Sequence, residues 1–100
     1  MQVEKLTSRA AQAEEFLKAL ANRHRLMILC ELHRGEQPVG ALQAAVGLSQ
    51  SALSQHLARL REDNLVATRR EGQSIYYALA SREAEAVIAL MYDLFCKDEC

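Results

Sequence analysis

The 100-residue sequence is long enough for one domain, half of its residues are apolar, and its formal net charge is −1. A chain of this length buries only about two-thirds of its unfolded surface, which gives a single core with little margin. The N-terminal stretch MQVEKLTSRAAQAEE has no apolar signal-peptide core, and no apolar run approaches the length that spans a membrane. We therefore expect a cytoplasmic protein that does not enter a membrane.

The charges are not spread evenly. Residues 1–34 carry six Lys or Arg against four Asp or Glu, residues 49–73 carry four against three, and residues 82–100 carry two against five. Local positive charge attracts anionic partners such as the DNA backbone. The C-terminal end is therefore the segment least suited to contact DNA phosphates.

Two helices are predicted before residue 35. Apolar residues recur at helical spacing from about residue 8 to 20, and Asn22 is a suitable N-cap for a second helix that ends near Arg34. Residues 26–30 of this second helix are apolar on nearly every side. This pattern predicts a helix in the centre of the fold.

A helix–turn–helix is predicted over about 39–63. Gly35 and Pro38 interrupt the helical pattern, a short helix follows over about 39–46, and Gly47 ends it. Ser49 caps the next helix. A short helix, a glycine-containing turn and a longer helix are typical of this DNA-binding motif.

The rest of the chain predicts a β-hairpin and one further helix. The segments LVATRR and SIYYAL are rich in β-branched and aromatic residues and flank EGQ, so a two-stranded wing is expected over about 65–79. Ser81 caps a last helix over about 82–96, which carries apolar residues over a wide arc. The fold class is mainly α with a small β-hairpin: one winged helix-turn-helix domain over 1–100, with additional N- and C-terminal helices (about 8–20 and 82–96) that form a dimer interface.

The second helix of the helix–turn–helix has one apolar and one polar side. Leu53, Leu57 and Leu60 share the apolar side, while short polar residues occupy the other. Glutamine pairs bidentately with adenine, and arginine reaches phosphate or base. The candidate DNA contacts on this helix are Gln50, Ser51, Ser54, Gln55, His56 and Arg59. A histidine in this place also has the alternative of bonding within the protein.

The predicted wing strengthens the DNA interpretation. RREGQ places Arg69, Arg70 and Gln73 around a glycine tip, where they would meet the backbone or the minor groove. An ordinary solvated helix face and a winged helix that binds only proteins are the alternatives. A protein-interaction module would show no salt-dependent preference among DNA duplexes.

The segments LKALANRHRLMILCEL, GLSQSALSQHLARLREDNLV and TRREGQSIYYAL resemble the ArsR-type winged-helix repressors over nearly the whole chain. The resemblance implies a symmetric homodimer joined through the first and last helices. It also implies binding of double-stranded DNA at an inverted-repeat operator, with Gln50, Ser51, Ser54, Gln55 and His56 as contacts from the recognition helix. The wing would add Arg69, Arg70 and Gln73.

The cysteines bear on which signal is sensed. Thiols stay reduced in the cytosol, so three cysteines do not indicate a disulfide framework. Arsenic and cadmium sensors of the family usually carry Cys-x-Cys near the end of the second helix, where this chain has only Cys30. Zinc and nickel sensors often use histidines of the last helix, and SREAEAVIALMYDLFCKDEC has none.

The pair Cys30 and Cys96 is similar to that of the persulfide-sensing branch, which includes BigR, SqrR and HlyU. That resemblance implies that persulfides or polysulfides form a sulfur-containing bridge between these redox-sensing cysteines and weaken operator binding. As a hypothesis for selectivity, Cα atoms held more than about 7 Å apart would admit a polysulfide bridge and strain a disulfide. We expect Cys30 to be a core position whose burial excludes other oxidants.

Two other interpretations of the cysteines stay open. In the first interpretation, each cysteine is an ordinary structural residue of the core, since cysteine is among the most often buried residues. In the second, Cys30, Cys96 and Cys100 bind zinc together with His33, or bind arsenite without it. We find no glycine-rich phosphate loop, Ser–His–Asp spacing or carboxylate pair in an evident cleft, so we expect neither an enzyme nor a cofactor.

Overall fold

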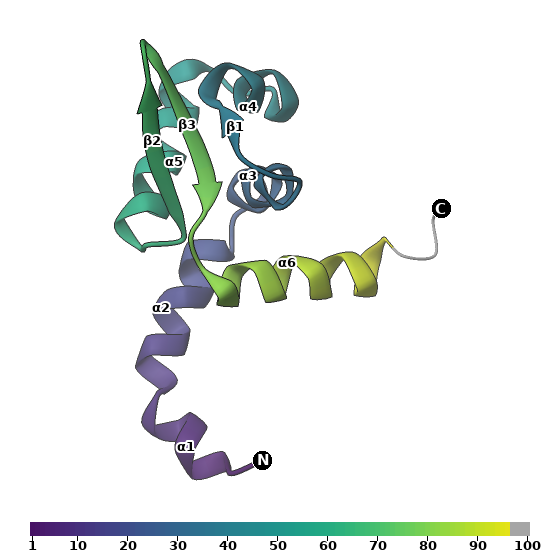
Figure 1. Cartoon of the computed structure of the whole chain (residues 1–100). Coiled ribbons are helices and arrows are strands. Elements are labelled where there is room, and N and C mark those ends of the chain that lie inside the picture. The colour runs from purple at the N-terminus through teal and green to yellow at the C-terminus, as the bar shows by residue number, and fades with distance from the viewer. Residues whose placement is uncertain (97–100) are drawn as a thin grey trace.

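The computed structural model describes residues 1–96 as a helical body with a small antiparallel sheet (Figure 1). The elements in chain order are α1 (Val3–Ser8), α2 (Ala10–Leu20), α3 (Arg23–His33), β1 (Gln37–Pro38), α4 (Val39–Val46), α5 (Gln50–Glu62), β2 (Val66–Glu71), β3 (Ser74–Leu79) and α6 (Arg82–Phe95). This arrangement confirms the predicted winged helix-turn-helix, in which α4 and α5 form the helix–turn–helix and β2–β3 the wing.

Side-chain caps fix the beginnings of three helices as the sequence predicts. The Asn22 side chain accepts hydrogen bonds from the backbone N–H groups of His24 (2.9 Å) and Arg25 (3.1 Å) at α3. Ser49 accepts from Ala52 N–H at α5, and Ser81 accepts from Ala84 N–H at α6. These bonds satisfy donors that the first helical turn leaves free, so each helix begins where its cap lies.

The core lies where α3, α4, α5 and the sheet meet. Leu53, Leu57 and Leu60 of α5 are buried, as their spacing predicts. They join Ile28, Leu29 and Leu32 of α3, Leu42 and Val46 of α4, Leu65 and Val66 at the wing, and Ala84 and Ile88 of α6. Burial of one side of α5 leaves its other side free to meet a partner.

The sheet has three strands, so the prediction of a two-stranded hairpin was incomplete. The strand order is β1-β3-β2, with Gln37 opposite Tyr77 and Pro38 opposite Tyr76. Pro38 is tolerated because β1 is an edge strand, where a missing backbone donor costs no ladder bond. A two-residue strand has no periodicity for sequence analysis to detect.

α2 confirms the helix predicted over about 8–20, but α1, which precedes it, was not predicted. α1 ends at Ser8, and Arg9, with a φ of −111° and a ψ of 11°, separates it from α2. In Figure 1, α2 and α1 extend away from the body in one direction and α6 in another. Large apolar side chains are exposed on α2 and on α6, including Leu17 (56%) of α2 and Leu94 (62%) and Phe95 (71%) of α6.

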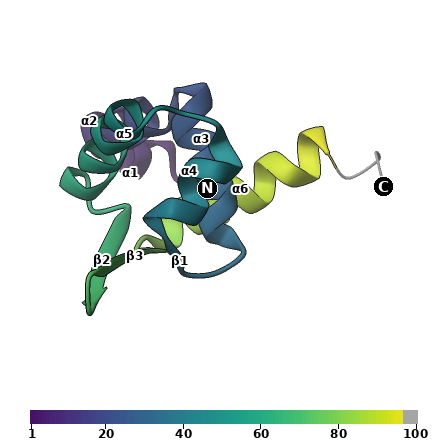
Figure 2. The same ribbon diagram turned by 90° about the horizontal axis from the view of Figure 1, so that it is seen from above.

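From above, the wing and α6 project from the body in different directions (Figure 2). Among residues 1–96, no helix has both the length and the apolar character needed to cross a membrane.

Candidate DNA-binding surface and cysteine pair

The first half of α5 presents a small polar surface to solvent. Gln50, Ser51, Ser54 and Gln55 are all exposed. At 100° per residue, Ser51, Ser54 and Gln55 fall within one arc opposite the buried leucines. Short hydroxyl and amide side chains allow close approach to a groove and offer both donors and acceptors. The structure therefore brings Ser51, Ser54 and Gln55 together on one face, and Gln50 is exposed beside it at the first position of the helix.

His56 does not share this face. Its ring lies against that of His24 of α3 in a tilted arrangement, with centroids 5.8 Å apart and planes inclined by 35°. Burial, the charge of Arg25 and the nearby His24 lower the pKa of His56, so the neutral imidazole is favoured. His56 thus has a partner within the protein, the alternative that the sequence had left open.

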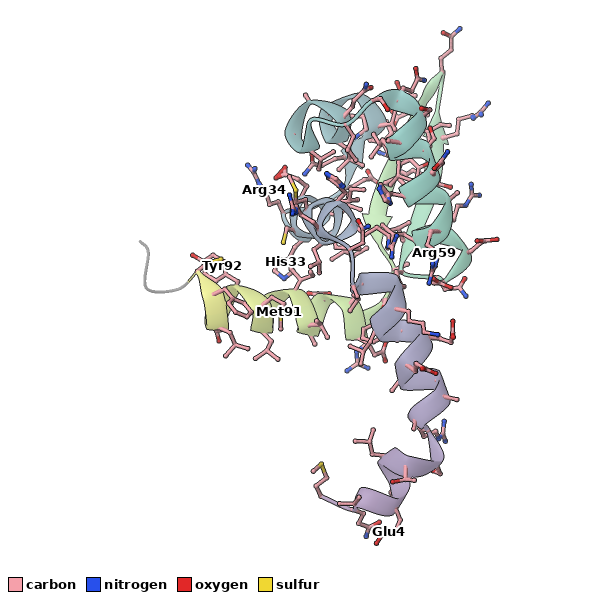
Figure 3. The ribbon with its side chains drawn as sticks, turned by 180° about the vertical axis from the view of Figure 1, so that it is seen from behind. Glu4, His33, Arg34, Arg59, Met91 and Tyr92 are labelled. Carbon is pink, nitrogen blue, oxygen red and sulfur yellow. The ribbon has the colours of Figure 1, made fainter. Side chains whose placement is uncertain are left out.

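Arg59 lies near the C-terminal end of α5, on the side of α2 (Figure 3). Its Nε donates to Asp63 Oδ2 at 2.8 Å, and this bond raises the pKa of Arg59. The charge of Arg59 helps to lower the pKa of the nearby Arg25. Arg25 Nε also donates to the Ala19 carbonyl at 2.6 Å. The predicted contact Arg59 therefore belongs to a charged cluster where α2, α3 and α5 meet.

The two wing arginines lie on opposite faces of the sheet. Arg69 is opposite Tyr76, and Arg70 is opposite Ile75. Side chains alternate along a strand, so Arg70 shares a face with the buried Val66, the face that packs on α5. Arg70 and Gln73 are exposed near the tip, and the turn residue Gly72 has a φ of +62°, which favours glycine.

Arg69 is held by acidic side chains. Its guanidinium contacts both Glu36 carboxylate oxygens, with Nε at 3.0 and 2.9 Å and Nη2 at 2.8 Å, and Nη1 contacts Glu71 at 2.6 Å. The guanidinium also lies over the Tyr76 ring, 4.6 Å from its centroid. Arg69 lowers the pKa of Glu36, while the pKa of Arg69 itself is raised, chiefly by Glu36 and then by Glu71. We call these four residues the wing clamp.

Cys30 on α3 and Cys96 at the end of α6 are free thiols, and both are exposed. The prediction of Cys30 as a core position is wrong, since only Ile28, Leu29 and Leu32 of α3 are buried. Cys30 lies about 160° from Leu32 around the helix, so the core covers the opposite side. Partial burial by the surrounding protein still raises the pKa of the Cys30 thiol, and the charges of Cys96 and Glu31 raise it further. The two cysteines therefore lie within one protomer, on helices that pack against each other.

The residues proposed for a metal site are only partly described. His33 is exposed at the end of α3, on the side of α6 where Met91 and Tyr92 lie (Figure 3). No group of three or more His, Cys, Asp or Glu within residues 1–96 is arranged to hold a metal ion. Cys100 lies outside the described residues.

Comparisons with known proteins decide the family. Residues 22–68 match the model of bacterial regulatory proteins of the arsR family. The transcriptional activator HlyU of Vibrio cholerae is 48% identical over 97 residues, which cover 97% of this chain and 90% of that protein. This chain belongs to the ArsR family. It is therefore a DNA-binding transcriptional regulator of that family, as its resemblance implied.

Solved structures agree with this assignment. The transcriptional repressor BigR from Xylella fastidiosa is 38% identical and superposes with a TM-score of 0.92 over 96% of this chain and 98% of that one. The homodimeric winged helix-turn-helix DNA-binding domain of Mb0332 from Mycobacterium bovis is 34% identical, with a TM-score of 0.77 over 93% and 86% of the two chains. The winged-helix fold of this chain is thus shared with regulators of the same family.

Two of the predicted DNA contacts have partners within the protein that the sequence did not reveal. Glu36 in the loop before β1 holds Arg69, and His24 at the beginning of α3 holds His56. Neither partner follows from local periodicity because each contact joins distant segments. The sequence signal for the wing clamp was limited to an acidic residue, Glu36, next to the predicted break at Gly35.

Proposed function

We propose that this ArsR-family regulator is a homodimeric repressor that binds an inverted-repeat operator and senses persulfides through Cys30 and Cys96. The observation that carries the sensing proposal is that α3 and α6, each with an exposed free thiol, pack against one another. Two exposed thiols within one protomer are accessible to a small reagent. Their helices join the sensing pair directly to the DNA-binding body.

Persulfide chemistry supplies both the sulfur and the oxidising equivalent. The Cys30 thiolate attacks the outer sulfur of RS–SH, the S–S bond breaks, and RS⁻ leaves with the electron pair, so Cys30 becomes a persulfide. The same transfer occurs at Cys96. The deprotonated Cys96 persulfide then attacks the inner sulfur of the Cys30 persulfide and expels HS⁻. This route leaves a bridge of three sulfur atoms, and each additional transfer before closure lengthens it by one.

The bridge is proposed to act by fixing α6 against α3. Operator release requires only that the bridged protein bind DNA more weakly by a coupling free energy of about 1–3 kcal/mol, a factor of about 5–150. Peroxide supplies no bridging sulfur, and we propose that it is the poorer inducer because a disulfide must bring the two Cα atoms within about 7 Å.

DNA binding is assigned to α5 and the wing. Gln50, Ser51, Ser54 and Gln55 supply hydrogen bonds to base edges or phosphates in the major groove, and Arg70 and Gln73 approach the flanking backbone. The sequence-predicted residues His56, Arg59 and Arg69 all have protein partners. We assign His56 and Arg69 mainly to positioning α5 and the wing, and Arg59 to a phosphate contact that competes with Asp63.

A homodimer would place two such surfaces about one DNA turn apart. The Mb0332 domain is homodimeric, and the exposed apolar side chains of α2 and α6 offer this chain a comparable interface. A second copy removes these side chains from water, which favours association.

Intact mass and operator affinity after exposure to glutathione persulfide or to peroxide test the sensing proposal. Persulfide is expected to add bridging sulfur and weaken operator binding, and Cys30→Ser or Cys96→Ser is expected to abolish both effects. Cys100→Ser is the matched control and should respond like the unmodified chain. An unchanged mass and affinity, with zinc or arsenite releasing the DNA instead, would contradict persulfide sensing.

A further inference from the structure

Beside Cys30 the surface is hollowed between α3 and α4. The hollow has a volume of about 610 Å³ and is lined by Leu26, Met27 and Cys30 of α3 and by Ala45 and Val46 of α4, with Arg23 and Glu31 of α3 at its edge. This volume falls within the range of about 300–1,000 Å³ that is usual for small-molecule sites. We call it the Cys30 hollow.

One helix places a cation, an apolar surface and a thiol in line. Arg23, Met27 and Cys30 fall within one arc of α3 at 100° per residue. Arg23 precedes Cys30 by seven positions, which corresponds to about 10 Å along the helix axis. A ligand that reacts at Cys30 and extends along the apolar residues therefore meets the Arg23 guanidinium about two helical turns away.

The charges at the hollow are not equivalent. Glu31, the residue after Cys30, is paired with Arg34 at 3.5 Å, and its charge raises the pKa of Cys30. Within residues 1–96, Arg23 takes part in none of the ion pairs. An anionic group on a ligand is therefore attracted to the Arg23 end and repelled from the Glu31 end.

We infer that the Cys30 hollow binds the organic part of the sulfur donor, and that the donor is a persulfide with a carboxylate about 10 Å from its sulfane sulfur, as in a persulfidated tripeptide. The inference rests on the proposed persulfide-sensing function and names its substrate class. Arg23 binds the carboxylate, and the aliphatic chain lies against Met27 and Val46.

Binding in this orientation directs the outer sulfur of the donor to Cys30. The Cys30 thiolate attacks that sulfur, the S–S bond of the donor breaks, and the organic thiolate leaves with the electron pair and takes up a proton from water. Cys30 retains the sulfur as a persulfide. Binding raises the local concentration of donor at a thiol whose raised pKa keeps the reactive thiolate scarce. Inorganic hydrogen persulfide is too short to reach Arg23 while it reacts at Cys30, about 10 Å away along the helix, and gains no such advantage.

The test compares two donors on the full chain. The initial rate of sulfur addition at Cys30 is measured by mass spectrometry with glutathione persulfide and, separately, with inorganic hydrogen persulfide. Arg23→Gln is expected to lower the rate with glutathione persulfide about fivefold, the scale of one exposed ion pair. The rate with the inorganic donor should not change. Ala45→Phe, which fills the hollow without altering charge, should likewise slow only the organic donor.

Arg61→Gln on α5 removes an equal charge far from the hollow and serves as the matched control, with no change expected for either donor. Equal loss with both donors, or no loss with either in the Arg23 and Ala45 variants, overturns the hollow as a binding site while persulfide sensing stands. Failure of Cys30 in the unmodified chain to gain sulfur from either donor overturns the sensing proposal itself.

Discussion

Glu36 and Arg69 lie 33 residues apart in sequence, yet both oxygens of the Glu36 carboxylate accept hydrogen bonds from Arg69 Nε, at 3.0 and 2.9 Å. Gln37, the next residue, donates from its side chain to the Glu31 carbonyl at 2.7 Å. The loop after α3 is therefore tied both to its own helix and to the wing. Together the two contacts connect α3, which carries Cys30, to the wing that is proposed to bind DNA.

The wing clamp predicts different effects for the two adjacent wing arginines. Arg70→Ala should lower the salt dependence of operator binding, with the slope of log affinity against log salt falling by about 0.9 per protomer, because one phosphate contact is lost. Arg69→Ala should weaken binding without lowering this slope, because the clamp already neutralises its charge. Fluorescence anisotropy titrations from low to high salt measure both slopes.

Glu36→Gln is the matched test of the clamp, since it removes one carboxylate and keeps the size of the side chain. It should leave Arg69 held by Glu71 alone and make the salt dependence steeper, with tighter binding to DNA of unrelated sequence. If Arg69→Ala instead lowers the slope as much as Arg70→Ala does, Arg69 is a phosphate contact and the positioning role fails.

The pKa of Cys30 predicts a change in thiol reactivity when Cys96 is replaced. Cys96 raises the pKa of Cys30, so Cys96→Ser should lower that pKa and increase the thiolate fraction near neutral pH. Alkylation of Cys30 by iodoacetamide should then be faster, as followed by peptide mass spectrometry between pH 7 and 9. Cys100→Ser controls for loss of another thiol. An unchanged rate would mean that the two thiols do not interact.

The His24–His56 contact predicts that acid weakens the packing of α5 on α3. The pKa of His56 is lowered in the folded chain, so the unfolded chain binds more protons below about pH 6.5, the usual histidine value. The contribution of neutral His56 to the free energy of unfolding is therefore complete above pH 6.5. It is lost as the pH falls through the folded-state pKa of His56.

Urea unfolding at pH 7.5, 6.5 and 5.5, at one protomer concentration, measures this dependence. His56→Gln should flatten the decline in the free energy of unfolding, whereas His33→Gln, which removes a histidine outside the contact, should retain it. A decline as steep in His56→Gln as in the unmodified chain would assign the acid sensitivity to groups other than His56.

Local signals explain how much of the fold could be predicted from the sequence. The caps Asn22, Ser49 and Ser81 act on residues within three positions, and the leucine spacing of α5 reports its buried side, so these features were confirmed. β1 and the wing clamp depend on contacts between distant segments and carry no periodic signal.

Cys30 shows why composition alone predicted its surroundings wrongly. An unbroken apolar run predicts burial on all sides, but a neighbouring element must be present to cover each side. The core covers Ile28 and Leu29, while the side of Met27 and Cys30 borders the hollow beside α4 and stays accessible. The apolar residues 26–30 therefore belong to two surfaces, one side of α3 that faces the core and another that lines the Cys30 hollow.

The exposed apolar face of α6 predicts that dimerisation depends on Leu94. Leu90 and Leu94 are 49% and 62% exposed and lie one helical turn apart. Leu94→Asp would bring a charge into the proposed interface, so sedimentation should shift from dimer to monomer and operator affinity should fall at least tenfold. Ala89→Asp introduces the same charge on the opposite side of α6, where no interface is proposed, and should leave the dimer intact. A Leu94→Asp variant that remains dimeric would remove this face of α6 from the interface and leave α1 and α2 to form it.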